Sequence, residues 1–415
     1  MKWLVLIGAG ALLSACTSVD VLGAREQTSE VKEPPSPPEE EPAGTGGLPN
    51  VLEERHRIPI SQVNARLNDA FLQLFFGDPE TEAVFFDQGD GTAYIQDIAN
   101  GDVRTDSMAY GMLVTVHLDH REVFDKLWGW AKEHMLSTSG PSAGLLRWRC
   151  DTSGENCAAA AATDASSIIA TTLFTAETRW GAAGDHAYGE DALALLDAMV
   201  AIEARNGGVV DGVVDCFDEE AALPRLSSRS PEEEVAVDYL MPAFYEVWAR
   251  HDRDRAELWT RAAENARDLL SRVAHPETGL LPEVVSYSGS PDSERGNYRA
   301  TTARTLLNLA LDHLWFGPFD WVVEQNERRL DFFLEQGVDE YVSEYTIAGE
   351  PLVSFNTAAH RSLVALAAGT SESSKHDVFL EVLLDEPVPT GSFRYYDGML
   401  YMISLLVLSG QMTPG

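Results

Sequence analysis

The side chains of this chain that are suited to chemistry are carboxylates and aromatic rings. Asp106 and Asp164 each lie where a helical pattern of apolar residues begins, and the helix dipole favours a carboxylate there whatever else it does. Such a group can also exchange a proton with a bound molecule. Trp148 lies off any regular helical pattern, so its ring is better placed to contact a ligand than to pack in a core.

No motif for a different chemistry competes with these residues. The chain has no Ser-His-Asp order, no phosphate-binding loop and no G-x-G-x-x-G fingerprint. It also has no CxxC or HExxH spacing, so we expect neither a metal nor a cofactor.

The charge of the chain narrows the choice of ligand. Its 30 Lys and Arg against 66 Asp and Glu give a formal net charge of -36. Binding to nucleic acid or anionic lipid needs clustered positive charge, so this balance argues against both partners. A neutral ligand such as a carbohydrate is easier to accommodate, since aromatic rings stack on the C–H-rich faces of sugars.

The first residues predict a lipoprotein signal. A basic start is followed by an apolar run over residues 4–13 and by Leu13-Ser14-Ala15-Cys16, a small-residue cleavage site that ends in cysteine. We expect residues 1–15 to be a signal peptide and Cys16 to be lipidated, which places the mature chain in a bacterial cell envelope, on its periplasmic or outer-membrane face. The alternative is a short membrane anchor, but a spanning helix needs about 20 apolar residues.

Two regions follow the predicted cleavage site. Residues 16–48 are rich in Glu, Pro and Gly, include Gly44, Gly46 and Gly47, and lack the apolar residues of a core, so they indicate a disordered tether. Residues 49–415 contain no second linker, and we expect them to form one domain.

Three cysteines lie in that domain. An oxidising compartment permits one disulfide, and Cys150 with Cys157 would close a short loop, which would leave Cys216 free.

The periodicity of the domain is helical nearly throughout, with apolar residues at steps of three and four. We expect about a dozen helices, over residues 61–76, 105–118, 121–136, 165–180, 187–203, 238–251, 256–273, 300–314, 319–334, 356–368, 375–384 and 396–409. Cap-like residues at several starts include Thr105, Asp164 and Asn356. Long connections at 77–104, 137–164, 204–237 and 274–299 hold much of the Gly, Pro and Asp. This pattern predicts an all-α fold, an α/α toroid.

Blocks of sequence resemble glycoside hydrolase family 8. Residues 101–112 read GDVRTDSMAYGM, which is similar to the family signature DVRTEGMSYGM. Further blocks occur in the family order at residues 74–78, 93–98, 124–131, 179–181, 239–246, 275–280 and 394–397. The likeness covers about residues 50–410 and looks most similar to the family's exo-oligoxylanases, which release xylose from the reducing end. It implies an (α/α)6 barrel.

The resemblance also implies a chemistry: hydrolysis of a β-1,4 link with inversion, by one carboxylic acid and one carboxylate base. The acid position, a glutamate in the family, is Asp106 here, and the alternative role for Asp106 is to stabilise the start of its helix. Asp164 matches a third acidic position that holds the sugar in a reactive shape, and its alternative role is an N-cap. Arg304 and Asn308 also match, but the base position is Thr301.

A threonine cannot take a proton from water at neutral pH, so the base needs another residue. Asp238, Asp292 and Glu294 are the candidates, each of which is otherwise a solvated surface charge.

The resemblance places aromatic residues against the sugar as well. Trp148, Tyr239 and Tyr396 match such positions, and Arg304 joins them as a substrate-binding residue. Aromatic residues at helical spacing are assigned to the core, namely Trp128, Trp130, Phe244 and Trp248.

Two functions remain open at this point. One is a lipid-anchored hydrolase with a modified catalytic pair. Its substrates would be β-1,4-linked oligosaccharides, with xylo-oligosaccharides as the expected class. The alternative is an oligosaccharide-binding lipoprotein that has lost turnover.

Overall fold

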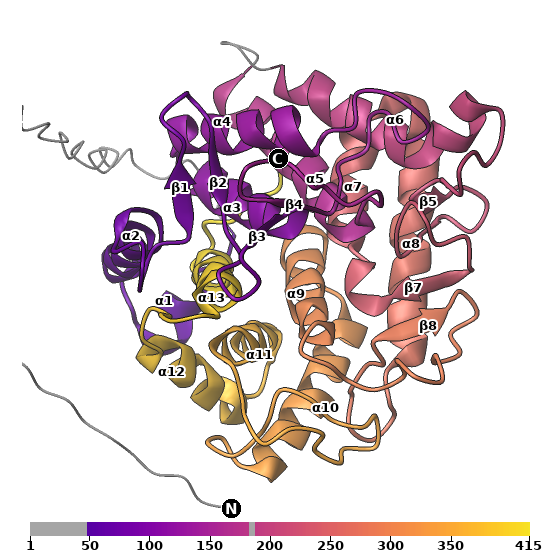
Figure 1. Ribbon diagram of the computed structural model, residues 1–415. Helices are drawn as coiled ribbons and strands as arrows, with labels where there is room; N and C mark the ends of the chain where they lie inside the picture. The colour runs from indigo at the N-terminus through magenta and orange to yellow at the C-terminus, as the bar shows by residue number, and fades with distance from the viewer. Residues whose placement is uncertain (1–47, 182–186) are drawn as a thin grey trace, which may run out of the picture. The chain divides into compact units, whose positions relative to one another are not determined.

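Six helices of the computed structural model form an inner ring in which each packs against the next (Figure 1). The structure describes residues 48–181 and 187–415, which belong to one compact unit. Within these residues the inner helices are α3 (Thr105–His117), α5 (Thr163–Trp180), α7 (Pro242–His251), α9 (Thr305–Phe316), α11 (Ala358–Thr370) and α13 (Arg394–Leu408). The ring closes because α13 packs against α3.

Six further helices of the described chain pack outside this ring, around the periphery of the view in Figure 1. They are α2 (Ile60–Phe76), α4 (Arg121–Trp130), α6 (Tyr188–Asn206), α8 (Ala256–Val273), α10 (Asp320–Gln336) and α12 (Asp377–Asp385). Two concentric layers of six helices are an (α/α)6 barrel, as the sequence predicts.

The sequences of the helices explain which layer each one joins. In α3, twelve residues from Thr105 to His117 are buried on every side, and such a helix is stable only inside a protein. In α8 the buried residues form one stripe that includes Leu258, Ala262 and Leu269, while the opposite face is charged. The apolar stripe therefore faces the inner ring and the charged face meets water.

Hydroxyl side chains are buried in α5, and the helix itself satisfies them. Ser167 donates to the carbonyl oxygen of Thr163 at 2.8 Å, and Thr172 donates to that of Ile168 at 2.6 Å. Each bond reaches back four residues, so these hydroxyls need no partner from another element.

The twelve predicted helices are confirmed, with ends that differ by a few residues. Short helical segments adjoin several of them: a π-helical turn η1 (Ala131–Met135) and the 3-10 turns η2 (Val237–Tyr239), η3 (Arg253–Arg255), η4 (Thr302–Arg304) and η5 (Ser374–His376). The helix α1 (Val51–His56) was not predicted.

All three predicted helix caps are wrong. The N-cap of α3 is Arg104, and Thr105 is the first residue of that helix. The N-cap of α5 is Ala162, and the carboxylate of Asp164 binds an arginine instead. The N-cap of α11 is Thr357, whose hydroxyl accepts from the amide of His360, and Asn356 precedes it.

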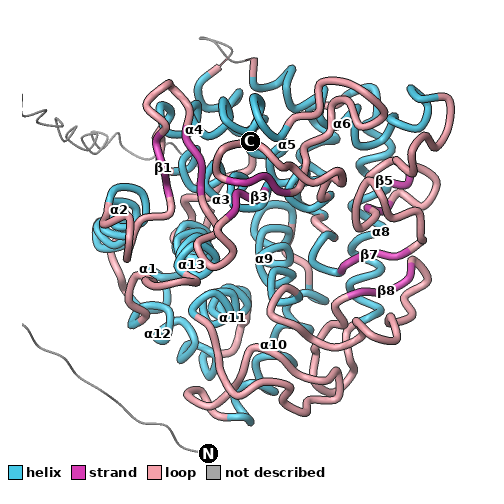
Figure 2. The backbone as a smooth tube through the Cα atoms, viewed as in Figure 1, coloured by secondary structure: helices cyan, strands magenta, loops and turns pink. Residues whose placement is uncertain are grey.

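Eight short strands lie in the long connections and were not predicted (Figure 2). Within the described residues they form four antiparallel pairs: β1 (Phe85–Asp87) with β2 (Ala93–Ile95), β3 (Asp102–Arg104) with β4 (Arg149–Asp151), β5 (Phe217–Asp218) with β6 (Leu223–Pro224), and β7 (Glu234–Ala236) with β8 (Val284–Ser286). Strands of two or three residues are too short to show an alternating pattern in the sequence.

The predicted signal peptide over residues 1–15, the predicted lipidation site Cys16 and the predicted tether up to residue 47 lie outside the described residues. Among the helices that are described, none combines the length and the apolar character needed to cross a membrane.

The cysteine prediction is confirmed. Cys150 and Cys157 form a disulfide, and Cys216 is a free, buried thiol.

Candidate active site

One cavity of about 360 Å³ brings together the residues that match the family's catalytic and substrate-binding positions, but none of the three alternative candidates for the base. The matching residues are Asp106, Trp148, Asp164, Tyr239, Thr301, Arg304 and Tyr396. The volume falls within the range of about 300–1,000 Å³ that is usual for small-molecule sites.

Asp106 lies in the first turn of α3, and hydrogen bonds hold that turn in place. The amide of Thr105 donates to the carbonyl oxygen of Trp148 at 3.0 Å, and the hydroxyl of Thr105 donates to that of Arg147 at 2.7 Å. The hydroxyl of Ser107 donates to the carbonyl oxygen of Ile95 at 2.6 Å. The residues on both sides of Asp106 are thus fixed to neighbouring segments, which sets the direction of its carboxylate.

The β3–β4 pair places Trp148 beside this turn. Arg104, just before α3, pairs with Arg149 across the two strands. Both guanidinium groups lie over the Trp148 ring, that of Arg104 at 5.7 Å and that of Arg149 at 5.1 Å from its centroid. These two cation–π contacts therefore fix the orientation of the Trp148 ring without a ligand.

Arg304 joins two aspartates beneath the cavity. Its Nη1 donates to Oδ2 of Asp164 at 3.0 Å, and its Nη2 forms an ion pair with Oδ2 of Asp238. Nη1 also contacts the hydroxyl of Tyr110 at 3.3 Å. Burial opposes the charge of Arg304, but Asp238, Tyr110 and Asp164 hold its pKa well above the usual value. Arg304 is therefore a permanent cation under the site.

Asn308, one helical turn after Arg304, fixes the segment that carries Asp238. Its side-chain amide donates to the carbonyl oxygens of Asp238 at 2.8 Å and of Leu240 at 3.1 Å. Arg304 at the end of η4 and Asn308 in the first turn of α9 thereby both hold Asp238 in place.

Two carboxylates of this group have a raised pKa. Burial raises the pKa of Asp106, the negative charge of Asp164 raises it further, and Arg304 and Arg104 oppose the shift. Burial raises the pKa of Asp238 to about 6 in spite of the attraction of Arg304. Asp106 is partly exposed to the cavity, whereas Asp238 is only 2% exposed. Asp106 is thus the group that is both accessible and inclined to carry a proton.

The three predicted candidates for the base do not line the cavity. Asp238 is engaged by Arg304. Asp292 accepts from the amides of Glu294 and Arg295, which lower its pKa, and it pairs with Arg295. Glu294 is exposed. A fourth carboxylate, which the sequence did not suggest, is Glu283, whose Oε1 accepts from the hydroxyl of Thr301 at 3.4 Å.

The structure separates the aromatic rings that line the cavity from those in the core. Tyr239 and Tyr396 line the cavity, and the four rings at helical spacing, Trp128, Trp130, Phe244 and Trp248, are at most 3% exposed. The hydroxyl of Tyr396 is buried without a hydrogen-bond partner among the described residues. The ring of Phe393 is 70% exposed and also lines the cavity, so it is an aromatic residue that the sequence analysis missed.

Other lining residues were also missed, although some lie in the motif blocks. Arg104 pairs with Asp97 and with Asp102, each at 3.1 Å, and Asn100 donates to Asp97 at 2.8 Å. These bonds close one wall of the cavity. Asp97 and Arg104 lie inside blocks that match the family, so these two residues could have been predicted as part of the site from the sequence.

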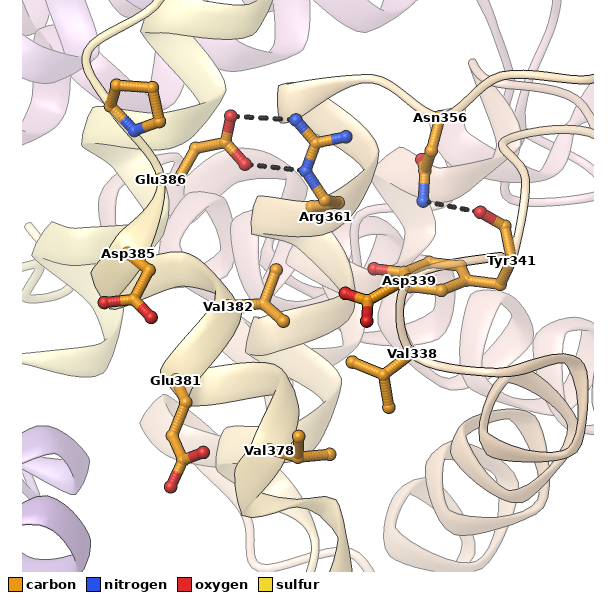
Figure 3. A pocket seen from close by; sticks show the side chains of 11 residues that line it. Val338, Asp339, Tyr341, Asn356, Arg361, Val378, Glu381, Val382, Asp385 and Glu386 are labelled. Atoms are coloured by element: carbon orange, nitrogen blue, oxygen red, sulfur yellow. Dashed lines mark hydrogen bonds and ion pairs between the residues drawn. The ribbon is translucent and has the colours of Figure 1, made fainter.

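A larger hollow of about 580 Å³ lies elsewhere, against α11, α12 and the segment around Val338 (Figure 3). Arg361 meets both carboxylate oxygens of Glu386 there, at 2.6 Å and 2.8 Å, and the amide of Asn356 donates to the main-chain oxygen of Tyr341. Tyr341, the aromatic residue of this hollow, is 2% exposed. The hollow therefore offers no ring face to a sugar, unlike the cavity around Asp106.

Comparison with known sequences identifies relatives over nearly the whole described chain. The family model of glycosyl hydrolases family 8 matches residues 85–410. A reducing end xylose-releasing exo-oligoxylanase of Halalkalibacterium halodurans is 34% identical over 363 residues, which cover 84% of this chain and 90% of the relative. The corresponding enzyme of Paenibacillus barcinonensis is 32% identical over 379 residues, which cover 88% of this chain and 96% of the relative.

Solved structures share the fold. A family 8 enzyme of Teredinibacter turnerae, solved as a xylobiose complex, superposes with a TM-score of 0.82 at 29% sequence identity. The match covers 89% of this chain and 98% of the other.

Proposed function

This chain belongs to glycosyl hydrolase family 8, and on that basis we propose that it hydrolyses β-1,4-linked xylo-oligosaccharides with inversion at the anomeric carbon. The two relatives described above are named for release of xylose from the reducing end of oligoxylans. The cavity with Asp106, Asp164 and several aromatic rings supports the same class of substrate for this chain.

Asp106 is the general acid in this proposal, and its position in the first turn of α3, open to the cavity, is the observation that carries it. A general acid must hold a proton at the working pH and release it to the leaving oxygen. Burial and the charge of Asp164 favour the protonated form of Asp106, and its partial exposure to the cavity gives it access to a substrate. Asp164 and Asp238 are held by Arg304, so neither is free for that task.

The acid is modified relative to the family signature, because an aspartate replaces a glutamate. The carboxyl group is drawn back by one carbon–carbon bond, about 1.5 Å. Displacements near 1 Å lower rates by about a hundredfold, so we expect this enzyme to be slower than a glutamate variant of itself.

Asp164 and Arg304 hold the sugar at the point of cleavage. Asp164 lines the cavity and keeps one carboxylate oxygen for Arg304 at 3.0 Å, which leaves the other available to a sugar hydroxyl. Hydrogen bonds to ring hydroxyls that strengthen as the ring distorts supply part of the catalysis in such enzymes.

The test is hydrolysis of defined oligosaccharides by the mature chain. Xylotriose and xylotetraose should be cleaved, whereas cello- and chito-oligosaccharides should be poorer substrates, and proton NMR of the fresh product should show the inverted anomer. Asp106→Asn should remove the activity without changing the melting temperature. If no oligosaccharide is cleaved while calorimetry still shows xylotriose binding, the proposal is wrong and the chain is a binding protein.

We also propose that the mature chain is attached to a bacterial cell envelope through lipid on Cys16. The support is the signal-like sequence before Cys16 and the Glu- and Pro-rich segment after it. Stable anchoring depends on the acyl chains, since the tether has no apolar segment of its own. Cys16→Ser should therefore move the protein out of the detergent phase in a Triton X-114 partition, and unchanged partitioning would contradict the proposal.

A further inference from the structure

We infer that Glu283 accepts the proton of the attacking water, and that the proton reaches it through the hydroxyl of Thr301. This inference rests on the proposed hydrolysis and supplies the base that its inverting mechanism requires. It gives a role to a residue that lies outside every sequence motif considered above.

The geometry starts with Thr301, which lines the cavity together with Asp106. Its hydroxyl donates to Oε1 of Glu283 at 3.4 Å. A hydroxyl has one proton to donate and two lone pairs to accept with. Because the proton of Thr301 points to Glu283, its lone pairs are available to a water molecule on the cavity side.

The main chain of Glu283 is fixed on both sides. Its amide donates to the carbonyl oxygen of Asn297 at 2.9 Å, and its own carbonyl oxygen accepts from the amide of Val237 at 3.0 Å. Glu283 immediately precedes β8, which pairs with β7, and η2 with Asp238 follows β7. The pairing of β7 with β8 therefore positions the main chain of Glu283 next to the segment that contains Asp238 and Tyr239.

Glu283 does not line the cavity and is connected to it through Thr301. Apart from Asp106, the other carboxylates at or beside the cavity are already engaged. Arg304 holds Asp164 and Asp238, and Arg104 holds Asp97. Within residues 48–181 and 187–415, no lysine or arginine forms an ion pair with Glu283. Glu283 therefore differs from Asp164, Asp238 and Asp97 in having no fixed cation beside it and in accepting the hydroxyl of a residue that lines the cavity.

The proton transfers balance in this arrangement. The water oxygen forms a bond to the anomeric carbon while one of its protons passes to the Thr301 oxygen, and the Thr301 proton passes to Glu283. The glycosidic carbon–oxygen bond breaks, and the leaving oxygen takes the proton of Asp106. Thr301 ends as a neutral hydroxyl, Glu283 is protonated and Asp106 is ionised; exchange with solvent returns both carboxyl groups to their starting states.

A purely structural pair would also show a hydrogen bond from Thr301 to Glu283, so the experiment must separate the two roles. Glu283→Gln keeps an acceptor oxygen for Thr301 and removes the base. Thr301→Val keeps the shape of the side chain and removes the relay. Thr301→Asp places a carboxylate directly on the cavity and makes Glu283 unnecessary.

The measurement is kcat and KM of xylotriose hydrolysis, with melting temperatures to establish that each variant folds. Glu283→Gln and Thr301→Val should each lower kcat by about 10²–10⁴-fold with little change in KM, and the double variant should be no worse than either, because both remove one step. Thr301→Asp should restore activity in the Glu283→Gln background. The acidic limb of the pH profile of kcat/KM should disappear in Glu283→Gln.

Glu294→Gln is the matched control, since Glu294 is an exposed acid in the same connection and does not line the cavity. Its kcat should equal that of the wild type. If Glu283→Gln keeps the wild-type kcat and acidic limb, the inference is wrong while the proposed hydrolysis stands. If the wild type itself cleaves no oligosaccharide, the proposed function and this inference fail together.

Discussion

Arg304 and Asp164 are joined by a 3.0 Å ion pair although 140 residues separate them in the sequence. The pair links the start of α5 to the start of α9, and Arg304 adds Asp238 to it. One guanidinium group therefore connects three separate segments of the barrel beside the cavity.

The first prediction concerns that group. Arg304→Met leaves two buried carboxylates without their cation, and breaking a buried pair in this way costs about 3–5 kcal/mol of unfolding free energy. Without Arg304 the pKa of Asp238 should rise above its present value of about 6. A carboxyl group whose pKa is raised by folding stabilises the protein at low pH, and this contribution disappears as the pH rises through that pKa. The decrease in unfolding free energy caused by Arg304→Met should therefore be smaller at pH 5 than at pH 8.

Urea unfolding at the two pH values is the measurement. Arg272→Ala is a suitable control, because Arg272 and Asp268 form an ion pair whose side chains are 45% and 63% exposed. Exposed pairs contribute about 0–1 kcal/mol, so this variant should unfold nearly as the wild type does. If the two substitutions lowered the free energy of unfolding equally, Arg304 would not have the stabilising role predicted here.

The second prediction concerns pH dependence. Asp164→Asn removes a negative charge that raises the pKa of Asp106, and it leaves Arg304 to act more strongly on Asp106. Both effects lower the pKa of Asp106. Because the acid must be protonated, the alkaline limb of the pH profile of kcat should move to lower pH in this variant. An alkaline limb that stays in place would show that Asp106 does not control it.

The third prediction concerns the reach of the acid. Asp106→Glu extends the carboxyl group by about 1.5 Å towards the cavity, and kcat on xylotriose should rise by about 10- to 100-fold. Asp106→Asn, which cannot donate a proton in this way, should fall below detection. A glutamate variant that is slower than the wild type would mean that the backbone of α3 already compensates for the shorter side chain.

The fourth prediction concerns Phe393, whose exposed ring lines the cavity. Phe393→Ala should raise KM by about tenfold with kcat unchanged, because a stacked ring contributes on the order of 1.4 kcal/mol to binding of substrate and transition state alike. Phe355 is also exposed, at 57%, but does not line the cavity, so Phe355→Ala should leave both constants unchanged. A matching effect of the two substitutions would argue against a sugar-binding role for Phe393.

The helices of this fold could be predicted because their residues carry the pattern within a single segment. The apolar periodicity of residues 105–118 predicted α3, and the position of Trp148 outside such a pattern predicted that it is not a core residue. Both agree with the structure. The three-residue strands β3 and β4 could not be found in this way, since their pairing joins segments that are more than 40 residues apart.

The site was predictable only where its residues belong to recognisable motifs. Asp106, Asp164 and Arg304 do, and they meet in one cavity. Glu283 lies in the connection at 274–299, and its relation to Thr301 depends on how β8 pairs with β7. The engagement of Asp238 by Arg304 likewise depends on packing between η2 and η4. Neither relationship leaves a local pattern in the sequence.

The closure of the inner ring has a consequence for how the chain acquires its structure. The first inner helix, α3, packs against the last, α13, and Arg394 at the start of α13 donates to the carbonyl oxygen of Ala83 at 3.0 Å, 311 residues earlier. During synthesis, α3 is therefore made long before α13, the neighbour that closes its side of the ring. Contacts of such long sequence separation slow folding. A chain that stops before residue 394 should therefore fold no better than one that stops much earlier, because the inner ring cannot close without α13.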